Sequence, residues 1–202
     1  MANICNTEFY INGDKESIKK FDDLISKYKD VNDYMSIEIL KIAKDYDLDK
    51  EDINLSGLIF WYKLEDENTI HFDMESKWSA CVDFVVKIKE KLNLNLSISY
   101  CEVEPACEIF NIHDENNRFT HLECCVDILE FFGECTMEYY TFEQAIENWF
   151  TDMESYIDIT KWNNLTTINE KIKIINDFDY SKFDDENISE YTMYKIGIFN
   201  RI

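Results

Sequence analysis

In the first half of the chain, the segment Leu58-Ile-Phe-Trp-Tyr62 is followed by the polar turn Glu65-Asp-Glu-Asn68 and by Thr69-Ile-His-Phe72. Two runs rich in β-branched and aromatic residues on either side of a polar turn predict a β-hairpin. Before the hairpin, alternating apolar residues predict a strand over 4–12, and apolar residues at helical spacing predict helices over 14–29 and 32–46. After it, the same patterns predict a helix over 79–92 and a strand over 94–100.

The order of these elements predicts an α+β fold. A strand, two helices, a hairpin, a helix and a strand make the ferredoxin-like split βαβ antiparallel sheet, with one inserted helix in the first crossover. Further strands are predicted over 107–112, 119–125 and 134–140, and capping boxes at Thr141/Gln144 and Thr167/Glu170 predict the starts of two helices. We therefore expect a ferredoxin-like domain over residues 1–112 and a C-terminal strand-and-helix extension over 113–202, packed on the same core.

Several of these segments resemble a known family. The opening Met1-Ala-Asn-x-Cys5, the segment Ile70-His-Phe-Asp-Met-Glu-Ser-Lys-Trp78 and the strand end Tyr100-Cys-Glu102 are similar to a phage- and plasmid-encoded ferredoxin-like domain family of the YubB type. The resemblance covers about residues 1–112 and implies a fold and an origin in a mobile element, with no established chemistry. The chain departs from the family at Ile4, where the family usually has tryptophan.

The composition excludes several classes of protein. The chain has 42 Asp and Glu residues against 20 Lys and Arg, a net charge of −22. This balance argues against a nucleic-acid binder and against docking on anionic lipid, because both need clustered positive charge. The N-terminus has no signal-peptide pattern and no run of 18 apolar residues occurs. We therefore expect a cytoplasmic protein of a bacterial host cell, with its seven cysteines reduced.

Negative charge is concentrated in the middle of the chain. Between Lys91 and Lys161 there are fifteen Asp and Glu residues and a single basic residue, Arg118, which gives a net charge of −14. Such a surface serves solubility, or it receives a basic protein partner, such as a host nucleic-acid-binding defence nuclease that the chain inhibits as a DNA mimic. We expect a non-enzymatic phage or plasmid protein that acts by protein–protein contact. The contacts expected from this segment are Glu102, Glu104, Glu108, Glu123, Asp127 and Glu130.

Two alternatives belong to different classes. Cysteines and histidines are dense over 101–135, where His121-x-x-Cys124 has the spacing of a zinc-ligand pair, so a zinc-binding or hydrolytic enzyme is one alternative. The cluster consists of Cys101, Cys107, His113, His121, Cys124, Cys125 and Cys135. No matching Cys-x-x-Cys pair occurs, and cysteines in apolar strands are commonly buried in a core. The other alternative is a structural module that associates with itself through a sheet edge.

The remaining patterns predict no catalytic residue, cofactor or bound metal. Asp45-x-Asp47-x-Asp49 resembles the start of a calcium loop, but Lys50 and Ser56 stand where such a loop needs glycine and glutamate. The aromatic residues near the hairpin and at the following helix and strand are expected in the core rather than in a pocket. These residues are Trp61, Tyr62, Trp78 and Tyr100.

Overall fold

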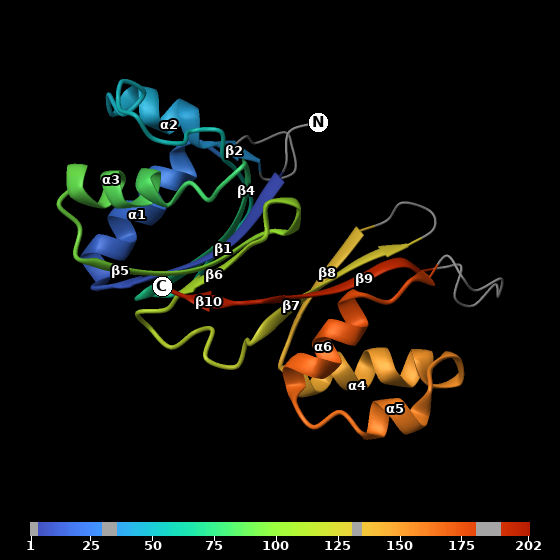
Figure 1. Cartoon of the computed structure of the whole chain (residues 1–202). Helices are drawn as coiled ribbons and strands as arrows, with labels where there is room; N and C mark the ends of the chain where they lie inside the picture. Colours follow the sequence, from blue (N-terminus) through green and yellow to red (C-terminus); the bar gives the residue numbers. More distant parts are fainter. Residues whose placement is uncertain (1–3, 30–35, 131–134, 181–190) are drawn as a thin grey trace. The chain divides into compact units, whose positions relative to one another are not determined.

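The computed structural model describes residues 4–29, 36–130, 135–180 and 191–202. The chain divides into two units (Figure 1): the first consists of residues 1–120 and 200–202, and the second of residues 121–199. Each unit has a hydrophobic cluster of its own. The sequence predicted a boundary at 112 and one shared core; the chain instead enters the second unit after Thr120 and returns to the first at Asn200.

No helix in the described part of the chain is long and apolar enough to cross a membrane.

The first unit contains a mostly antiparallel sheet built around the predicted hairpin. Its strands run in the order β10-β6-β5-β1-β4-β3-β2, and each adjacent pair is antiparallel except β10 with β6. The strands are β1 (Ile4–Gly13), β2 (Ile37–Glu38), β3 (Leu58–Asp66), β4 (Thr69–Lys77), β5 (Leu96–Glu104), β6 (Ile109–His113) and β10 (Asn200–Arg201). The hairpin prediction is confirmed, because β3 and β4 pair with Tyr62 opposite Phe72.

Helices α1 (Lys15–Lys27), α2 (Ile39–Asp45) and α3 (Val82–Lys91) contribute to one core with the sheet. Helix α1 begins at Asp14, whose carboxylate accepts a hydrogen bond from the Ser17 backbone N–H at 2.9 Å, so its first turn is capped. Its Phe21 packs with Phe72 and Phe9 of the sheet, and the Phe9 and Phe72 rings stack with centroids 4.8 Å apart. Burial of these large rings stabilises this core.

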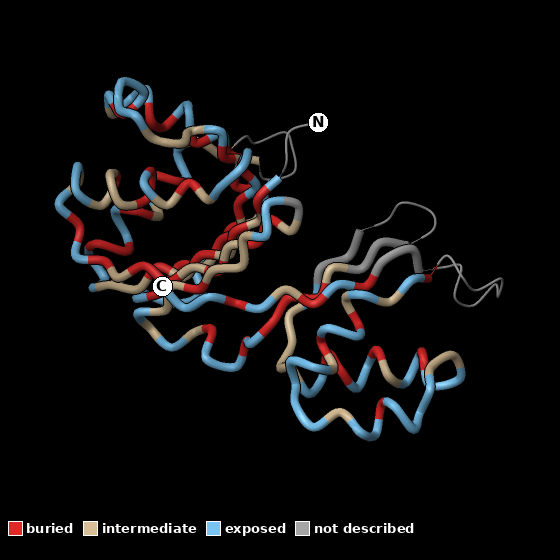
Figure 2. The backbone as a smooth tube through the Cα atoms, viewed as in Figure 1, coloured by how far each residue is buried: buried red, intermediate tan, exposed pale blue. Residues whose placement is uncertain are grey.

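Strand alternation gives the sheet two chemically different faces. Along β1, Phe9 and Ile11 are fully buried with the helices, whereas Glu8 and Tyr10 point to the opposite face and are partly buried. In Figure 2 the buried positions follow the strands and the inner sides of the helices within each unit. The face away from the helices therefore carries polar and charged side chains close to the sheet.

The second unit has a three-stranded antiparallel sheet in the order β8-β7-β9, with helices from the segment between β8 and β9. Its strands are β7 (Cys124–Glu130), β8 (Cys135–Tyr140) and β9 (Tyr191–Ile198), and its helices are α4 (Phe142–Met153), α5 (Ile159–Asn163) and α6 (Ile168–Asn176). Short 3-10 turns, η1 (Pro105–Cys107) and η2 (Glu154–Tyr156), follow β5 in the first unit and α4 in the second. Both predicted capping boxes are confirmed, Thr141 with Gln144 and Thr167 with Glu170.

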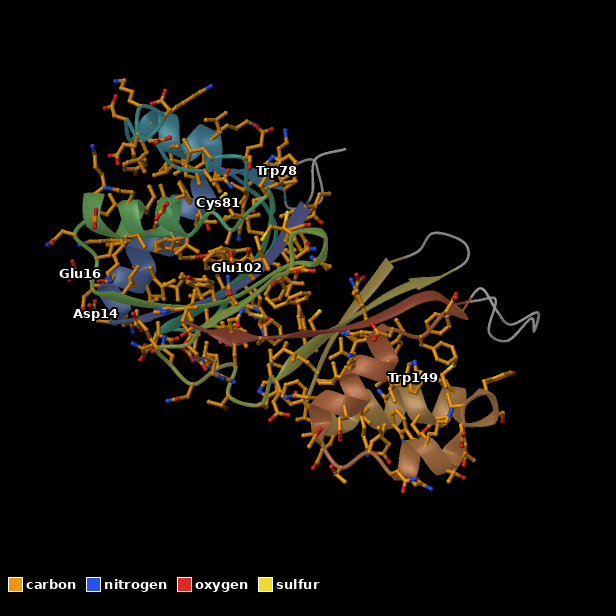
Figure 3. All side chains as sticks on the ribbon, in the orientation of Figure 1. Asp14, Glu16, Trp78, Cys81, Glu102 and Trp149 are labelled. Carbon is orange, nitrogen blue, oxygen red and sulfur yellow. The ribbon has the colours of Figure 1, made fainter. Side chains whose placement is uncertain are left out.

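Trp149 is the centre of the second unit's core (Figure 3). It is 1% exposed, and its indole Nε1–H donates a hydrogen bond to the Tyr180 hydroxyl at 2.8 Å. Its ring lies 5.4 Å from the rings of both Trp162 and Phe178, measured between centroids. Helices α4 and α5 and the segment after α6 are therefore joined by a single aromatic cluster.

Several predicted elements differ from the structure. The strand expected over 119–125 begins at Cys124, and the described part of the helix expected over 32–46 is α2, after the short strand β2. Residues 30–35 lie outside the described part. The strand expected from 107 begins at Ile109, because Pro105 starts a 3-10 turn that ends at Glu108 with a left-handed φ of 56°. Trp78, expected in the core, is 55% exposed with a φ of 71°, so that prediction is wrong.

Candidate functional site

Helices α4, α5 and α6 enclose a groove of about 390 Å³ within the second unit. Four of its side chains come from one face of α4, because positions three and four residues apart lie on the same side of a helix. The segment from α5 into the first turns of α6 supplies the rest. The lining residues are Glu143, Ile146, Glu147, Phe150, Trp162, Leu165, Thr166, Thr167, Ile168 and Lys171.

The groove combines an aromatic wall with two carboxylates. Phe150 and Trp162 are stacked, with ring centroids 5.3 Å apart and an interplanar angle of 20°. Glu143 and Glu147 are exposed on α4. Among the described residues of the second unit, the one ion pair within 4 Å joins Lys161 to Asp158, so neither groove carboxylate is neutralised by a described lysine or arginine. Lys171 enters the groove differently: its Nζ lies 5.4 Å from the Trp162 ring centroid.

The capping box of α6 holds one wall of the groove in place. The Glu170 backbone N–H donates to Thr167 Oγ1 at 3.2 Å, and the Thr167 backbone N–H donates to Glu170 Oε2 at 3.0 Å. Hydrogen bonds from the Thr167 backbone, and further ones from Thr166, hold the pKa of Glu170 below its usual value. Glu170 is thus engaged in the helix start, whereas Glu143 and Glu147 face the groove.

This arrangement suits a cationic side chain with an apolar stem. An aromatic face attracts a guanidinium or ammonium group through its quadrupole, and a carboxylate adds a charge-assisted hydrogen bond. The apolar stem of arginine or lysine can pack against Ile146 or Ile168 while its charged end meets the glutamates.

No protein-family model, curated protein or solved structure matches this chain. The resemblance to the YubB-type family therefore stays a prediction.

Three of the six acids expected to contact a partner lie in the first unit, and their surroundings differ. Glu104 is 2% exposed, so it cannot serve as a surface contact. The Glu102 carboxylate accepts hydrogen bonds from the Ala80 backbone N–H at 3.2 Å and from Asn111 Nδ2 at 2.6 Å, and thus ties β5 to its neighbours (Figure 3). Glu108 is exposed after η1.

The other three expected acids lie in the second unit. Glu123 is exposed, but its carboxylate accepts a hydrogen bond from the Phe142 backbone N–H at 2.8 Å, at the first residue of α4. Asp127 is partly buried opposite Lys195 of β9; burial raises the pKa of the Asp127 carboxyl, and the lysine opposes that shift. The side chain of Glu130 lies outside the described part of the chain. The six acids do not form one patch within either unit, and Glu143 and Glu147 were not among them.

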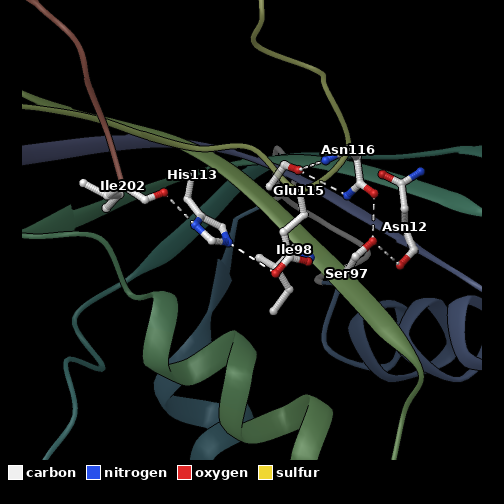
Figure 4. Close-up of polar contacts among 8 residues, drawn as sticks. Asn12, Ser97, Ile98, His113, Glu115, Asn116 and Ile202 are labelled. Carbon is white, nitrogen blue, oxygen red and sulfur yellow. Dashed lines mark hydrogen bonds and ion pairs between the residues drawn. The ribbon is translucent and has the colours of Figure 1, made fainter.

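The cysteines and histidines over 101–135 do not assemble a metal-ligating group among the described side chains. Cys101, Cys124 and Cys125 are fully buried, and burial raises the pKa of the last two thiols to about 12, so they remain neutral. His113 is engaged elsewhere (Figure 4): Nδ1 lies 3.1 Å from the Ile202 carbonyl oxygen and Nε2 lies 3.3 Å from Glu115 Oε1. Cys107 and His121 are exposed, and the side chain of Cys135 lies outside the described part.

A different cluster, which the sequence analysis missed, lies on the face of the first sheet away from the helices. Glu8, His71 and Asp73 each place one ligand atom within 4.8 Å of the others. His71 Nε2 is 2.9 Å from Glu8 Oε1 and 3.8 Å from Asp73 Oδ1. Burial and the charge of Glu8 raise the pKa of the Asp73 carboxyl, and His71 opposes that shift. The available signal was the i, i+2 spacing of His71, in the strand predicted over 69–72, and Asp73, directly after it, but the pairing with β1 was needed to add Glu8.

Proposed function

We propose that the chain acts by protein–protein contact, and that the groove of the second unit receives an arginine or lysine side chain of a basic partner protein. The observation that carries the proposal is the pair of carboxylates, Glu143 and Glu147, beside the stacked rings of Phe150 and Trp162. A cation that enters this groove gains charge-assisted hydrogen bonds from the glutamates and contact with the partly exposed ring of Phe150, which stacks on Trp162, itself only 6% exposed.

The charge of the second unit supports the same proposal. Residues 121–199 contain 17 Asp and Glu residues and five lysines, a net charge of −12 on 79 residues. A field of one sign raises the rate at which an oppositely charged partner arrives, and closely fitting groups then determine where it binds. In this division of roles, the general acidity attracts a basic partner and the groove provides a specific contact.

Lys171 makes a further expectation possible. Its ammonium group already lies over Trp162, so an incoming cation must displace it or share the ring with it. Removing this lysine should therefore strengthen binding of a basic peptide, whereas removing Lys173, which is exposed and does not line the groove, should do so only through the net charge.

Binding of a short fluorescein-labelled peptide of alternating arginine and glycine, followed by fluorescence anisotropy at about 0.15 M salt, tests the proposal. The double variant E143Q/E147Q should bind about tenfold more weakly than the control D152N/E154Q, because a charge-assisted hydrogen bond contributes about 1.5–3 kcal/mol. Both variants lose two negative charges, and the control residues are exposed and lie outside the groove. Equal affinities for the two variants would show that general acidity accounts for all the binding, and would refute the groove.

A narrower form of the proposal is that the partner is a nucleic-acid-binding enzyme, such as a host defence nuclease, which this chain inhibits as a DNA mimic. The acidity of the second unit supports it, whereas the inward-facing Glu102 and buried Glu104 do not. A nuclease captured through the groove should be released by competing duplex DNA, because both would occupy the same basic surface. If DNA does not displace a captured partner, the proposal of a basic partner still holds but the DNA mimicry is refuted.

For the first unit we propose the ferredoxin-like fold as the finer description. The four strands β5-β1-β4-β3 are adjacent in that order with antiparallel pairing, and helices precede β3 and β5. These features support the split βαβ arrangement. An experimental structure in which β1 does not lie between β5 and β4 would overturn this assignment.

A further inference from the structure

We infer that Glu8, His71 and Asp73 form a binding site for a divalent transition-metal ion on the first sheet, with Zn²⁺ as the probe that tests it. His71 and Asp73 are two residues apart on β4 and therefore point to the same face. The register places Glu8 of β1 directly opposite Asp73. Three potential ligands thus come from two central, hydrogen-bonded strands, which is a rigid support for a metal site.

The separations of the ligand atoms match those around a small metal ion. Zinc binds imidazole nitrogen and carboxylate oxygen at about 2.0–2.2 Å, so two ligands in a tetrahedral site lie about 3.3 Å from each other. The distances from His71 Nε2 are 2.9 Å to Glu8 Oε1 and 3.8 Å to Asp73 Oδ1, on either side of that value. Small rotations of the carboxylates would bring all three ligands to bonding distance of one ion.

The unsatisfied nitrogen of His71 is a second, independent observation. Its side chain is 14% exposed, and its Nε2 atom is buried with no hydrogen-bond partner, since Glu8 Oε1 is near but not aligned for a hydrogen bond. A buried polar atom without a partner is costly, and most such atoms in folded proteins are satisfied. A metal ion bound to the Nε2 lone pair would satisfy this atom and neutralise the adjacent carboxylates at the same time.

The surroundings orient His71 as neighbouring groups orient the histidines of known metal sites. Its other ring nitrogen, Nδ1, lies 3.7 Å from Glu65 Oε1, beyond the range of a direct hydrogen bond, so Glu65 adds a third carboxylate beside the ring. The ring stacks on Tyr10 at 4.0 Å between centroids, and the edge contact with Trp61 is at 4.5 Å. The imidazole is therefore held in position before an ion arrives.

Three protein ligands leave one position of a tetrahedral ion open. Zinc sites with four protein ligands are commonly structural, whereas sites with three keep a place for water or another donor. The mixed set of one imidazole and two carboxylates suits Zn²⁺ or Mn²⁺ better than a soft ion such as Cu(I). The ligand assigned here is thus a divalent ion of intermediate softness that keeps one exchangeable water molecule.

Calorimetric titration with Zn²⁺, in excess Mg²⁺ to occupy weak acidic sites, tests this inference. The wild-type chain should bind one zinc ion per chain with higher affinity than the rest of its surface, and H71Q should lose that binding event. H113Q is the matched control, because His113 also has a carboxylate, that of Glu115, within 3.3 Å but belongs to no cluster of three.

A second measurement separates loss of the site from loss of the fold. Asp73 and Glu8 repel each other without an ion, so D73N should melt at the same or a higher temperature than the wild type while losing the zinc-induced rise in melting temperature. Co²⁺ should quench the fluorescence of Trp61, and W61F should remove this quenching because Trp61 contacts His71. If H71Q and D73N bind zinc as tightly as the wild type, the ion is held by the general acidic surface and the inference is wrong.

Discussion

Replacing Tyr180 by phenylalanine should destabilise the second unit by about 1–3 kcal/mol, the cost of leaving a buried donor without an acceptor. The donor is the indole N–H of Trp149, which is 1% exposed and lies 2.8 Å from the Tyr180 hydroxyl oxygen. Because phenylalanine has nearly the same shape as tyrosine, the packing of the surrounding rings is retained. The effect therefore reports on the hydrogen bond, in the core beneath the groove residue Trp162.

Native-state amide hydrogen exchange by NMR is the appropriate assay, because it measures the protection of individual amides in each unit separately. A loss of about 1–3 kcal/mol corresponds to a fall of about 5- to 150-fold in protection of the slowest amides, and the fall should occur in β7 of the second unit. Amides of β1 in the first unit should keep their protection, since the two units have separate cores.

The Trp149→Phe variant provides the control for this hydrogen bond. In that background the indole N–H is absent, so Tyr180→Phe should cost much less, and the double-mutant cycle should give a coupling of about 1–3 kcal/mol. An equal cost of Tyr180→Phe in both backgrounds, or an equal loss of protection in β1 and β7, would show that this hydrogen bond does not stabilise the second unit.

Three further predictions concern charge and packing. The thermal midpoint of the wild type should rise as NaCl increases from low concentration to about 0.3 M, because salt screens the repulsion between its acids; a flat or falling midpoint would contradict this. Asp127→Asn should raise the thermal midpoint at pH 7, and the gain should vanish at pH 3. Because burial raises the pKa of Asp127 in the folded state, the stability associated with its protonated form is present below the unfolded-state pKa and is lost as the pH rises through the folded-state pKa. A variant less stable than the wild type at pH 7 would mean that the attraction between Asp127 and Lys195 outweighs the cost of burying the carboxylate. Gly57→Ala should lower the free energy of unfolding of the first unit by about 1–3 kcal/mol, measured by urea unfolding. A Cβ at this position would lie 2.6 Å from Met74 Sδ and 2.9 Å from Ile39 Cδ1, in a filled core. An unchanged urea midpoint would show that these side chains can move aside.

Local patterns in the sequence predict the elements of this fold well. The hairpin over β3 and β4, the helix after Asp14, and the two capping boxes depend on residues close together in the chain, and the structure confirms each of them. The division into two units could not be predicted in the same way, because no Pro/Gly-rich linker separates them and β10 returns to the first sheet from the far end of the chain. That return depends on the pairing of Asn200 with Asn111, a contact with no local signal.

The residues of the candidate site were harder to predict, because net charge along the sequence does not report which way a side chain points. Glu102 and Glu104 belong to the same dense acidic segment, but strand alternation turns both away from solvent. Glu123 is exposed and nevertheless engaged at the start of α4. Glu143 and Glu147 could have been found from their i, i+4 spacing beside Phe150 on an amphipathic helix, whereas Trp162 joins them through tertiary packing alone.

An NMR titration with the arginine-glycine peptide, followed through the four tryptophan indole N–H signals, tests whether the groove of the second unit receives a basic side chain. Trp162 lines the groove, Trp149 lies beneath it with its N–H bonded to Tyr180, and Trp61 and Trp78 belong to the first unit. We expect a saturable shift of the Trp162 indole signal, whose midpoint requires about tenfold more peptide in E143Q/E147Q than in D152N/E154Q, with the signals of Trp61 and Trp78 unchanged. A Trp162 signal that stays in place while the peptide binds would contradict it.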